Sequence, residues 1–217
     1  MNSKEYWNKV AKDKSFSTPF QMDIFKEYVD KDSKILDIGC GYGRTLKELY
    51  NNGYTNILGI DFSDEMINLA KEKNPIIEFK ITSGSKLDFR DDSFDAVILI
   101  AVLTCILDTK DQKNLIKEIY RVLKKDGVIY INDYLLNDTK MYLDRYEKYK
   151  SKFGEYGVFE TNDGGVFRHH KKEYLDNLLN CFKKEKSEIL KYITMNGHEV
   201  NGIYYIGVKT YENNNNI

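Results

Sequence analysis

Cysteine and proline are scarce in this chain of 217 residues. The three cysteines, Cys40, Cys105 and Cys181, are an odd number, lie far apart and form no C-x-x-C pair. This pattern excludes a disulfide framework and a zinc ribbon, and it favours a reducing compartment. The two prolines, Pro19 and Pro75, mark no linker rich in serine or glycine, so the sequence predicts one domain rather than two.

Long apolar runs and an excess of one charge are also absent. The first 14 residues are polar and charged, unlike a secretory signal peptide. The longest apolar run, residues 94–107, contains Asp95 and Thr104 and is shorter than the roughly 20 apolar residues that a membrane-spanning helix needs. The 33 basic and 34 acidic residues give a net charge of −1, which argues against nucleic-acid binding through bulk charge. We therefore expect a cytoplasmic protein that binds neither membranes nor nucleic acid.

Short apolar runs alternate with amphipathic segments through the first 134 residues. Strands are expected at residues 34–38, 56–60, 76–81, 96–101 and 128–134, and helices at 3–11, 19–28, 44–51, 63–73 and 112–123. Alternation of this kind favours a parallel sheet with right-handed crossovers and helices on both faces.

The alternation ends after Tyr134. Residues 157–167 read as a short hairpin, and we expect it to cap the sheet edge. Two β-like segments, 188–195 and 203–209, are joined by a turn at Asn196-Gly197, so the last strand should be antiparallel. The predicted fold is α/β: a doubly wound, mostly parallel seven-stranded sheet with an antiparallel last strand and a small insertion before the last two strands.

A glycine loop follows the first predicted strand. Residues 35–44 read ILDIGCGYGR, with Gly39, Gly41 and Gly43 at alternate positions before a helix. Glycine lets the backbone approach a ligand closely, and the helix N-terminus offers free N–H groups. In open α/β sheets ligands bind outside the carboxyl ends of the strands. A tight strand–helix turn also needs glycines, so the loop alone is weak evidence.

A carboxylate at the end of the second strand strengthens the interpretation. Asp61 lies 18 residues beyond Gly43, where it can accept hydrogen bonds from both hydroxyl groups of a ribose. The alternative is that Asp61 only caps the helix that begins near Ser63.

Four segments in order resemble the class I S-adenosylmethionine-dependent methyltransferases. They are residues 36–43 (LDIGCGYG), 59–66 (GIDFSDEM), 92–97 (DSFDAV) and 121–127 (RVLKKDG). The family's loop is G-x-G-x-G, whereas dinucleotide dehydrogenases favour G-x-G-x-x-G. Residue 44 is arginine, so the dehydrogenase pattern is broken.

The resemblance implies that the cofactor is S-adenosyl-L-methionine. The glycine loop would pass under its methionine part, Asp61 would hold the ribose, and Phe62 and Met66 would flank the adenine. Family members often place an acidic residue after strand three; here Ser83 and Gly84 stand there, and their backbone groups could substitute for it. The implied cofactor-binding residues are Asp37, Gly39, Gly41, Gly43, Asp61, Phe62, Met66, Ser83, Gly84 and Ala101.

The acceptor pocket should come from the segment after Tyr134. The candidates for a general base are His169, His170 and Tyr134, and two adjacent histidines on a strand cannot both face one site. The polar cluster around them also contains Glu160, Asp163 and Arg168, but its spacing matches no metal site, so no metal is expected. The N/D-P-P-Y/F motif of amide and adenine methyltransferases is missing after strand four.

The leading prediction is a methyltransferase that acts on a small molecule, as a monomer or a homodimer. One alternative is a non-enzymatic protein that binds an adenosyl ligand, and another is a nicotinamide-dependent oxidoreductase. The predicted organisation is an N-terminal helical lid (1–30), a cofactor-binding half (31–134), an acceptor-side insertion with a C-terminal hairpin (135–210), and a disordered tail (211–217).

Overall fold

The computed structural model describes residues 2–82, 86–195 and 197–210. Five strands run parallel in one sheet: β1 (Ile35–Ile38), β2 (Ile57–Asp61), β3 (Glu78–Ile81), β4 (Phe94–Ile100) and β5 (Leu123–Tyr134). Two more strands, β8 (Phe182–Ile193) and β9 (Glu199–Lys209), complete it in the order β3-β2-β1-β4-β5-β9-β8. Because β9 is antiparallel to both β5 and β8, the predicted fold class is confirmed.

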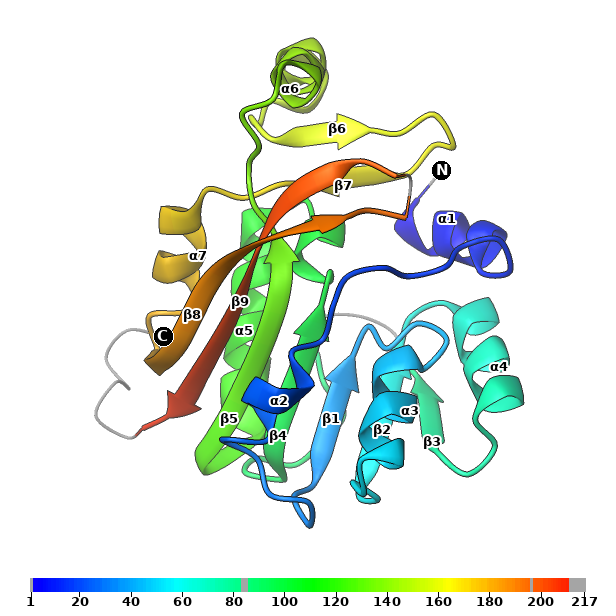
Figure 1. Cartoon of the computed structure of the whole chain (residues 1–217), viewed down its shortest axis with the longest axis vertical. Coiled ribbons are helices and arrows are strands. Elements are labelled where there is room, and N and C mark those ends of the chain that lie inside the picture. The colour runs from blue at the N-terminus through cyan, green and yellow to red at the C-terminus, as the bar shows by residue number, and fades with distance from the viewer. Residues whose placement is uncertain (1, 83–85, 196, 211–217) are drawn as a thin grey trace.

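Helices cover both faces of this sheet (Figure 1). On one face, α2 (Met22–Phe25), α3 (Arg44–Asn51) and α4 (Asp64–Lys73) supply apolar side chains to a core that includes Ile35 of β1. On the other, α5 (Thr109–Val122) and α7 (Lys172–Leu178) pack with Leu36. Neighbouring residues of a buried strand therefore serve opposite cores, which is why these strands read as continuous apolar runs.

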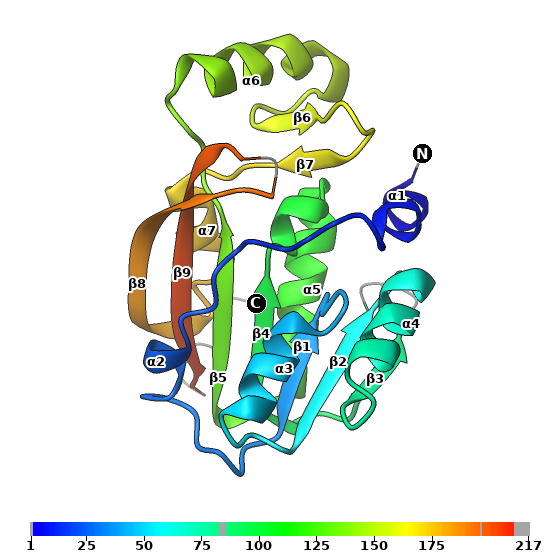
Figure 2. The same cartoon turned by 45° about the vertical axis from the view of Figure 1, so that its right-hand side comes forward.

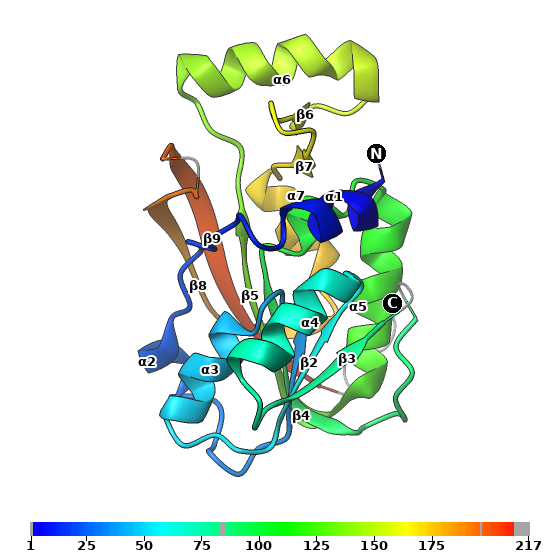
Figure 3. The same cartoon turned by 90° about the vertical axis from the view of Figure 1, so that its right-hand side faces the viewer.

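The insertion lies beyond the carboxyl ends of the parallel strands. It consists of α6 (Lys140–Phe153) and a hairpin of β6 (Val158–Glu160) and β7 (Val166–Arg168), and Figure 2 shows both above that end of the sheet. The predicted hairpin is confirmed. The N-terminal helix α1 (Ser3–Val10) packs on α4 at the same end, as Figure 3 shows from the side.

Several predicted element bounds differ from the structure, among them those of β8 and β9, which begin six and four residues earlier than predicted. The helix expected over residues 19–28 is helical only at Met22–Phe25, because Phe20 packs edge-on against Tyr130 and the Gln21 N–H donates to the Tyr130 hydroxyl (3.0 Å). Strand β5 begins at Leu123, five residues before its predicted start at residue 128. Its pairing with β4 is irregular between Leu123 and Val128, where Asp126 has a left-handed φ of +61°. The predicted tail, 211–217, lies outside the described residues.

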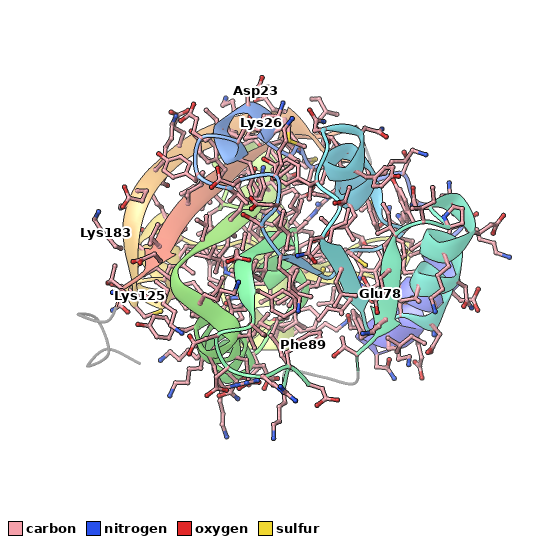
Figure 4. The ribbon with its side chains drawn as sticks, turned by 90° about the horizontal axis from the view of Figure 1, so that it is seen from below. Asp23, Lys26, Glu78, Phe89, Lys125 and Lys183 are labelled. Carbon is pink, nitrogen blue, oxygen red and sulfur yellow. The ribbon has the colours of Figure 1, made fainter. Side chains whose placement is uncertain are left out.

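The end of the molecule opposite the insertion exposes charged side chains of both signs. Figure 4, seen from that end, shows Asp23, Lys26 and Lys183 near the edge of the molecule. In the described part of the chain, none of the helices is long and apolar enough to cross a membrane.

Candidate functional site

A cavity lies where β1, β2, β4 and β5 end, at the edge of the sheet that the insertion covers. Parallel strands present their carboxyl ends at one edge, so residues far apart in sequence meet there. Asp37 and Asp61 line the cavity from β1 and β2, Ala101 lines it just beyond β4, and Tyr134 lines it from the end of β5.

The glycine loop forms one wall of this cavity. Gly39 and Gly41 line it and have left-handed φ values of +68° and +52°. A Cβ atom on Gly41 would lie 2.3 Å from Phe16 Cε2, and one on Gly39 would lie 2.7 Å from Val102 Cγ2. A larger residue at either position would therefore be strained and would push a neighbour out of the cavity wall. Gly43 does not line the cavity: a Cβ there would meet the Phe79 ring instead.

Asp61 joins the glycine loop to the start of α4. Its carboxylate accepts from the Gly41 N–H and from the Ser63 N–H, each at 2.9 Å. Ser63 is the N-cap of α4, and its hydroxyl accepts from the Met66 N–H (3.2 Å). Burial raises the pKa of Asp61, and the two backbone donors counteract that rise. Asp61 thus supports the helix start and also lines the cavity, so the two interpretations of this residue are compatible.

Asp37 presents a different kind of carboxyl group. It is 2% exposed and lines the cavity, yet no described residue donates a hydrogen bond to it. Burial raises its pKa to about 8, against the opposing effect of Arg44. A buried carboxyl group without a hydrogen-bond partner is costly unless a ligand supplies one. Its surroundings therefore suit a cationic group.

The remaining cofactor candidates divide into those that line the cavity and those the structure does not describe. Phe62 and Met66 line it beside Asp61, and Ala101 lines it with φ +56°. Ser83 and Gly84 lie outside the described residues. The carboxylate of Asp61, the apolar pair after it and the unpartnered Asp37 together fit a ligand with a ribose, a planar base and a positive charge.

Two of the three catalytic candidates meet at the far end of the cavity. The rings of Tyr134 and His169 stack at 5.4 Å and 15°, and both line the cavity. Burial lowers the pKa of His169 to about 3, so the ring is neutral near pH 7. Burial also raises the pKa of Tyr134, whose hydroxyl shares a hydrogen bond with Thr18 Oγ1 (2.7 Å).

His170 points elsewhere. It stacks on Tyr174 (5.4 Å) and does not line the cavity, which confirms that only one of the adjacent histidines faces it. Three other members of the predicted polar cluster bind elsewhere as well: Glu160 pairs with Lys152, Asp163 with Lys14, and Arg168 with Glu155 and the Leu107 carbonyl.

Several lining residues were missed by the sequence analysis. Thr18 comes from the N-terminal segment, Arg145 from α6, Cys105 from the turn after β4, and His198 from the β8–β9 connection. Only the helical spacing of Tyr142, Arg145 and Tyr146 on one face of α6 was visible as a signal. The others enter the cavity through loops whose path no local pattern fixes. Burial raises the pKa of Cys105, so its thiol stays protonated.

The α1 helix covers part of the cavity and bonds to elements on both sides of it. Asn8 Oδ1 accepts from Ser63 Oγ (2.7 Å), and Lys4 pairs with Asp64 (2.7 Å), which joins α1 to α4. On the other side, the Tyr6 hydroxyl donates to Asp163 in the β6–β7 turn (3.2 Å). Trp7, between these contacts, lines the cavity.

Known proteins resemble this chain over most of its length. A family model described as a methyltransferase domain matches residues 36–131. An uncharacterised protein of Methanocaldococcus jannaschii is 34% identical over 150 residues, 64% of this chain and 55% of that protein, so the chain spans about half of that relative. A carboxy-S-adenosyl-L-methionine synthase of Nautilia profundicola is 31% identical over 179 residues, covering 79% of this chain and 73% of the synthase. The crystal structure of a SAM-dependent methyltransferase from Methanosarcina mazei has a TM-score of 0.83 and 30% identity, covering 89% of this chain and 99% of that one.

Proposed function

This chain belongs to the class I S-adenosylmethionine-dependent methyltransferases, and from that premise we propose that it methylates a small molecule held in the partly covered cavity. The protein is thus an enzyme whose cofactor is S-adenosylmethionine, and the oxidoreductase and non-enzymatic alternatives lose their support. The observation that carries the small-molecule proposal is the roof formed by α1, the β6–β7 hairpin and α6 over the cavity. A nucleic acid or a folded protein would have to displace that roof.

The cofactor would occupy the end of the cavity lined by the glycine loop. We assign the ribose to Asp61, the faces of the adenine to Phe62 and Met66, and the positively charged part to Asp37. When bound, S-adenosylmethionine supplies a methyl group already activated by its sulfonium. The protein's task is then mainly to hold the acceptor atom in line and to exclude water.

The side chains near the acceptor end support catalysis by positioning. Tyr134 and Cys105 are protonated because burial raises their pKa values, and His169 is neutral. Neither Tyr134 nor Cys105 is an ionised base near pH 7, and with a pKa of about 3 His169 is a weak proton acceptor. An acceptor that ionises by itself, or that attacks through a lone pair, needs no such base.

The first experiment measures cofactor binding by calorimetry with S-adenosylhomocysteine and compares the wild type with Asp61→Asn. An amide in place of the carboxylate leaves one of the two backbone N–H groups without an acceptor, so affinity should fall about tenfold or more. Asp32→Asn, at an exposed position away from the cavity, should bind as the wild type does. Equal affinity for both variants contradicts the role given to Asp61.

The second experiment tests the acceptor class by following S-adenosylhomocysteine release. Small molecules, RNA, DNA and a mixed protein extract are offered separately. Turnover with small molecules alone supports the proposal, whereas turnover only with a macromolecule refutes it. A cytoplasmic location and a monomeric or homodimeric state stay predictions.

A further inference from the structure

We propose that the acceptor is a small aromatic molecule that carries a carboxylate, with Arg145 binding the carboxylate and His169 donating a hydrogen bond from Nε2. The inference rests on the proposed function, since it assigns a substrate class to the same cavity. It follows from three features of the acceptor end: its aromatic walls, its distribution of charge and the fixed tautomer of His169.

Aromatic rings make up much of the wall at this end. The lining rings at this end are Trp7, Tyr134, Tyr142, Phe159 and Phe167. They come from five separate segments of the chain, and an edge-to-face contact joins Trp7 to Phe167 (6.2 Å). A wall of rings in these orientations favours a flat aromatic ligand, which can contact both ring faces and ring edges.

Charge is divided between the two ends of the cavity. The acidic side chains that line it, Asp37 and Asp61, both belong to the cofactor end, where Arg44 also lines the cavity and offsets part of their charge. The acceptor end has Arg145, His169 and His198, and no acidic residue among the described residues that line it. An anion at this end would meet a cation and hydrogen-bond donors without facing a carboxylate, whereas a cationic acceptor would find no counter-charge.

Arg145 has no carboxylate partner among the described residues, in contrast to Arg121 and Arg168. Arg121 pairs with Glu118 and Asp91, and Arg168 pairs with Glu155. The Arg145 guanidinium instead lies over two cavity rings, 5.3 Å from the Tyr142 centroid and 5.0 Å from that of Phe159. Stacking on rings leaves the edge of the guanidinium and its N–H donors free for a planar carboxylate.

His169 lies against the same two rings. Its ring centroid is 4.9 Å from that of Phe159 and 5.5 Å from that of Tyr142, so Arg145 and His169 flank one patch of wall. The histidine is 5% exposed, and Nε2 has no partner among the described residues. A histidine nitrogen in a cavity wall, without a partner from the protein, is available to hydrogen-bond a ligand.

The surrounding hydrogen bonds fix which nitrogen of His169 carries the proton. The Asn137 N–H donates to the Tyr146 hydroxyl (3.2 Å), and that hydroxyl lies 2.7 Å from His169 Nδ1, where it can donate its own proton. The Asn137 side-chain amide is oriented by two backbone bonds, from Asn201 N–H and to the Leu135 carbonyl. Its NH₂ group therefore faces Nδ1 at 3.5 Å. With donors on Nδ1, the proton resides on Nε2, and His169 is a hydrogen-bond donor to the ligand rather than a base.

The binding test uses four probes of similar size with S-adenosylhomocysteine present: benzoate, benzamide, benzylamine and cyclohexanecarboxylate. Calorimetry should show benzoate binding about tenfold more tightly than benzamide, because a charge-assisted bond is stronger than a neutral one. Benzylamine should bind weakest, and the non-aromatic acid should bind more weakly than benzoate. Equal affinities for benzoate and benzamide, or no benzoate binding at millimolar concentration, overturn the inference.

Two variants of α6 separate charge recognition from folding. Arg145→Gln should remove the preference for benzoate over benzamide and leave S-adenosylhomocysteine affinity unchanged. Lys150→Gln removes the same charge from an exposed position of the same helix and should keep the preference. A preference that persists in Arg145→Gln refutes the role of this arginine. A purely structural role would weaken all four probes equally.

The tautomer is tested separately by nitrogen NMR of protein labelled at its three histidines, with His169→Gln identifying the signal. The Nε2–H form should be present at neutral pH and persist well into the acid range. The charged or titratable neighbours of the ring are Arg145, His170, Tyr134, Tyr142 and Tyr146. An Nδ1–H form, or an imidazolium at neutral pH, contradicts the assignment. Failure of the wild type to bind S-adenosylhomocysteine would instead contradict the proposed function, so the two failures are distinguishable.

Discussion

Two aspartates at the ends of adjacent strands have opposite environments. Asp61 accepts two backbone N–H groups that tie the glycine loop to α4, whereas Asp37, on the neighbouring strand, accepts none from the described residues. The pKa of Asp37 is raised to about 8, mainly by burial, so near pH 7 the free enzyme holds it largely protonated. A bound cation would shift that equilibrium toward the carboxylate.

This difference predicts that affinity for S-adenosylmethionine rises with pH. Below its pKa Asp37 is neutral, and binding a cation beside it must release a proton. Affinity should therefore increase toward pH 8 by up to about tenfold for each pH unit. Calorimetry in two buffers of different ionisation enthalpy measures the released proton directly.

The matched variant for this prediction is Asp37→Asn, which cannot ionise. It should bind the cofactor without proton release and with a flat pH profile over the same range. Proton release that persists in Asp37→Asn would assign the linkage to another group.

The short helix α1 is held beside the cavity by contacts to the elements on either side of it. It is fixed to α4 through Asn8 and to the β6–β7 turn through the bonds of Tyr6 and Lys14 to Asp163. Its N-terminus is capped by a reciprocal pair, Asn2 with Glu5, which stabilises the helix itself. The cap therefore stabilises the helix independently of the contacts that close it over the cavity.

Removal of the contact between the N-terminal segment and Asp163 of the β6–β7 turn should loosen α1 over the cavity. Asp163→Ala takes away the acceptor of both Tyr6 and Lys14, and a loss of about 1 kcal/mol in closure would speed cofactor dissociation about fivefold. Displacement of S-adenosylhomocysteine, followed through the fluorescence of Trp7, the single tryptophan, measures this rate.

The control is Asn162→Ala, which changes the neighbouring exposed residue of the same turn. Its dissociation rate should equal that of the wild type. An equal rate in both variants and the wild type would show that α1 does not limit ligand release.

Over the whole molecule, buried titratable groups act on stability in opposing directions. Burial lowers the pKa of His170 from 6.5 to about 3, so between these values the unfolded chain binds a proton that the folded protein does not. His170 therefore costs stability as pH falls below 6.5. Burial raises the pKa of Asp133 to about 7, so this carboxyl favours the folded state at low pH and that benefit is lost as pH rises to about 7.

A single substitution isolates the histidine contribution. His170→Phe keeps a ring against Tyr174 and removes the titration, so its stability relative to the wild type should rise by about 2 kcal/mol between pH 6.5 and pH 5. Urea unfolding at several pH values measures this difference. A difference that is constant with pH would show that His170 does not titrate between the folded and unfolded states.

Much of the fold could be read from the sequence because its signals are local. The alternation of apolar runs and amphipathic segments predicted the parallel strands, and the helix predicted over residues 63–73 is α4, with Ser63 as its N-cap. The predicted ends of an element were wrong where contacts with distant residues outweighed the local helical pattern. Phe20, for example, packs on Tyr130 of β5 instead of lying within a helix.

The cofactor end of the cavity was predictable and the acceptor end largely was not, for a physical reason. Glycine spacing and Asp61 lie next to strand ends, and a parallel sheet brings strand ends together whatever the rest of the chain does. Arg145, Thr18 and His198 reach the cavity from α6, the N-terminal segment and the β8–β9 connection, and only the packing of these segments on one another brings their side chains together. The sequence by itself therefore determined which strand ends carry the residues proposed to hold the cofactor, and the tertiary structure alone decided which side chains surround the proposed acceptor end.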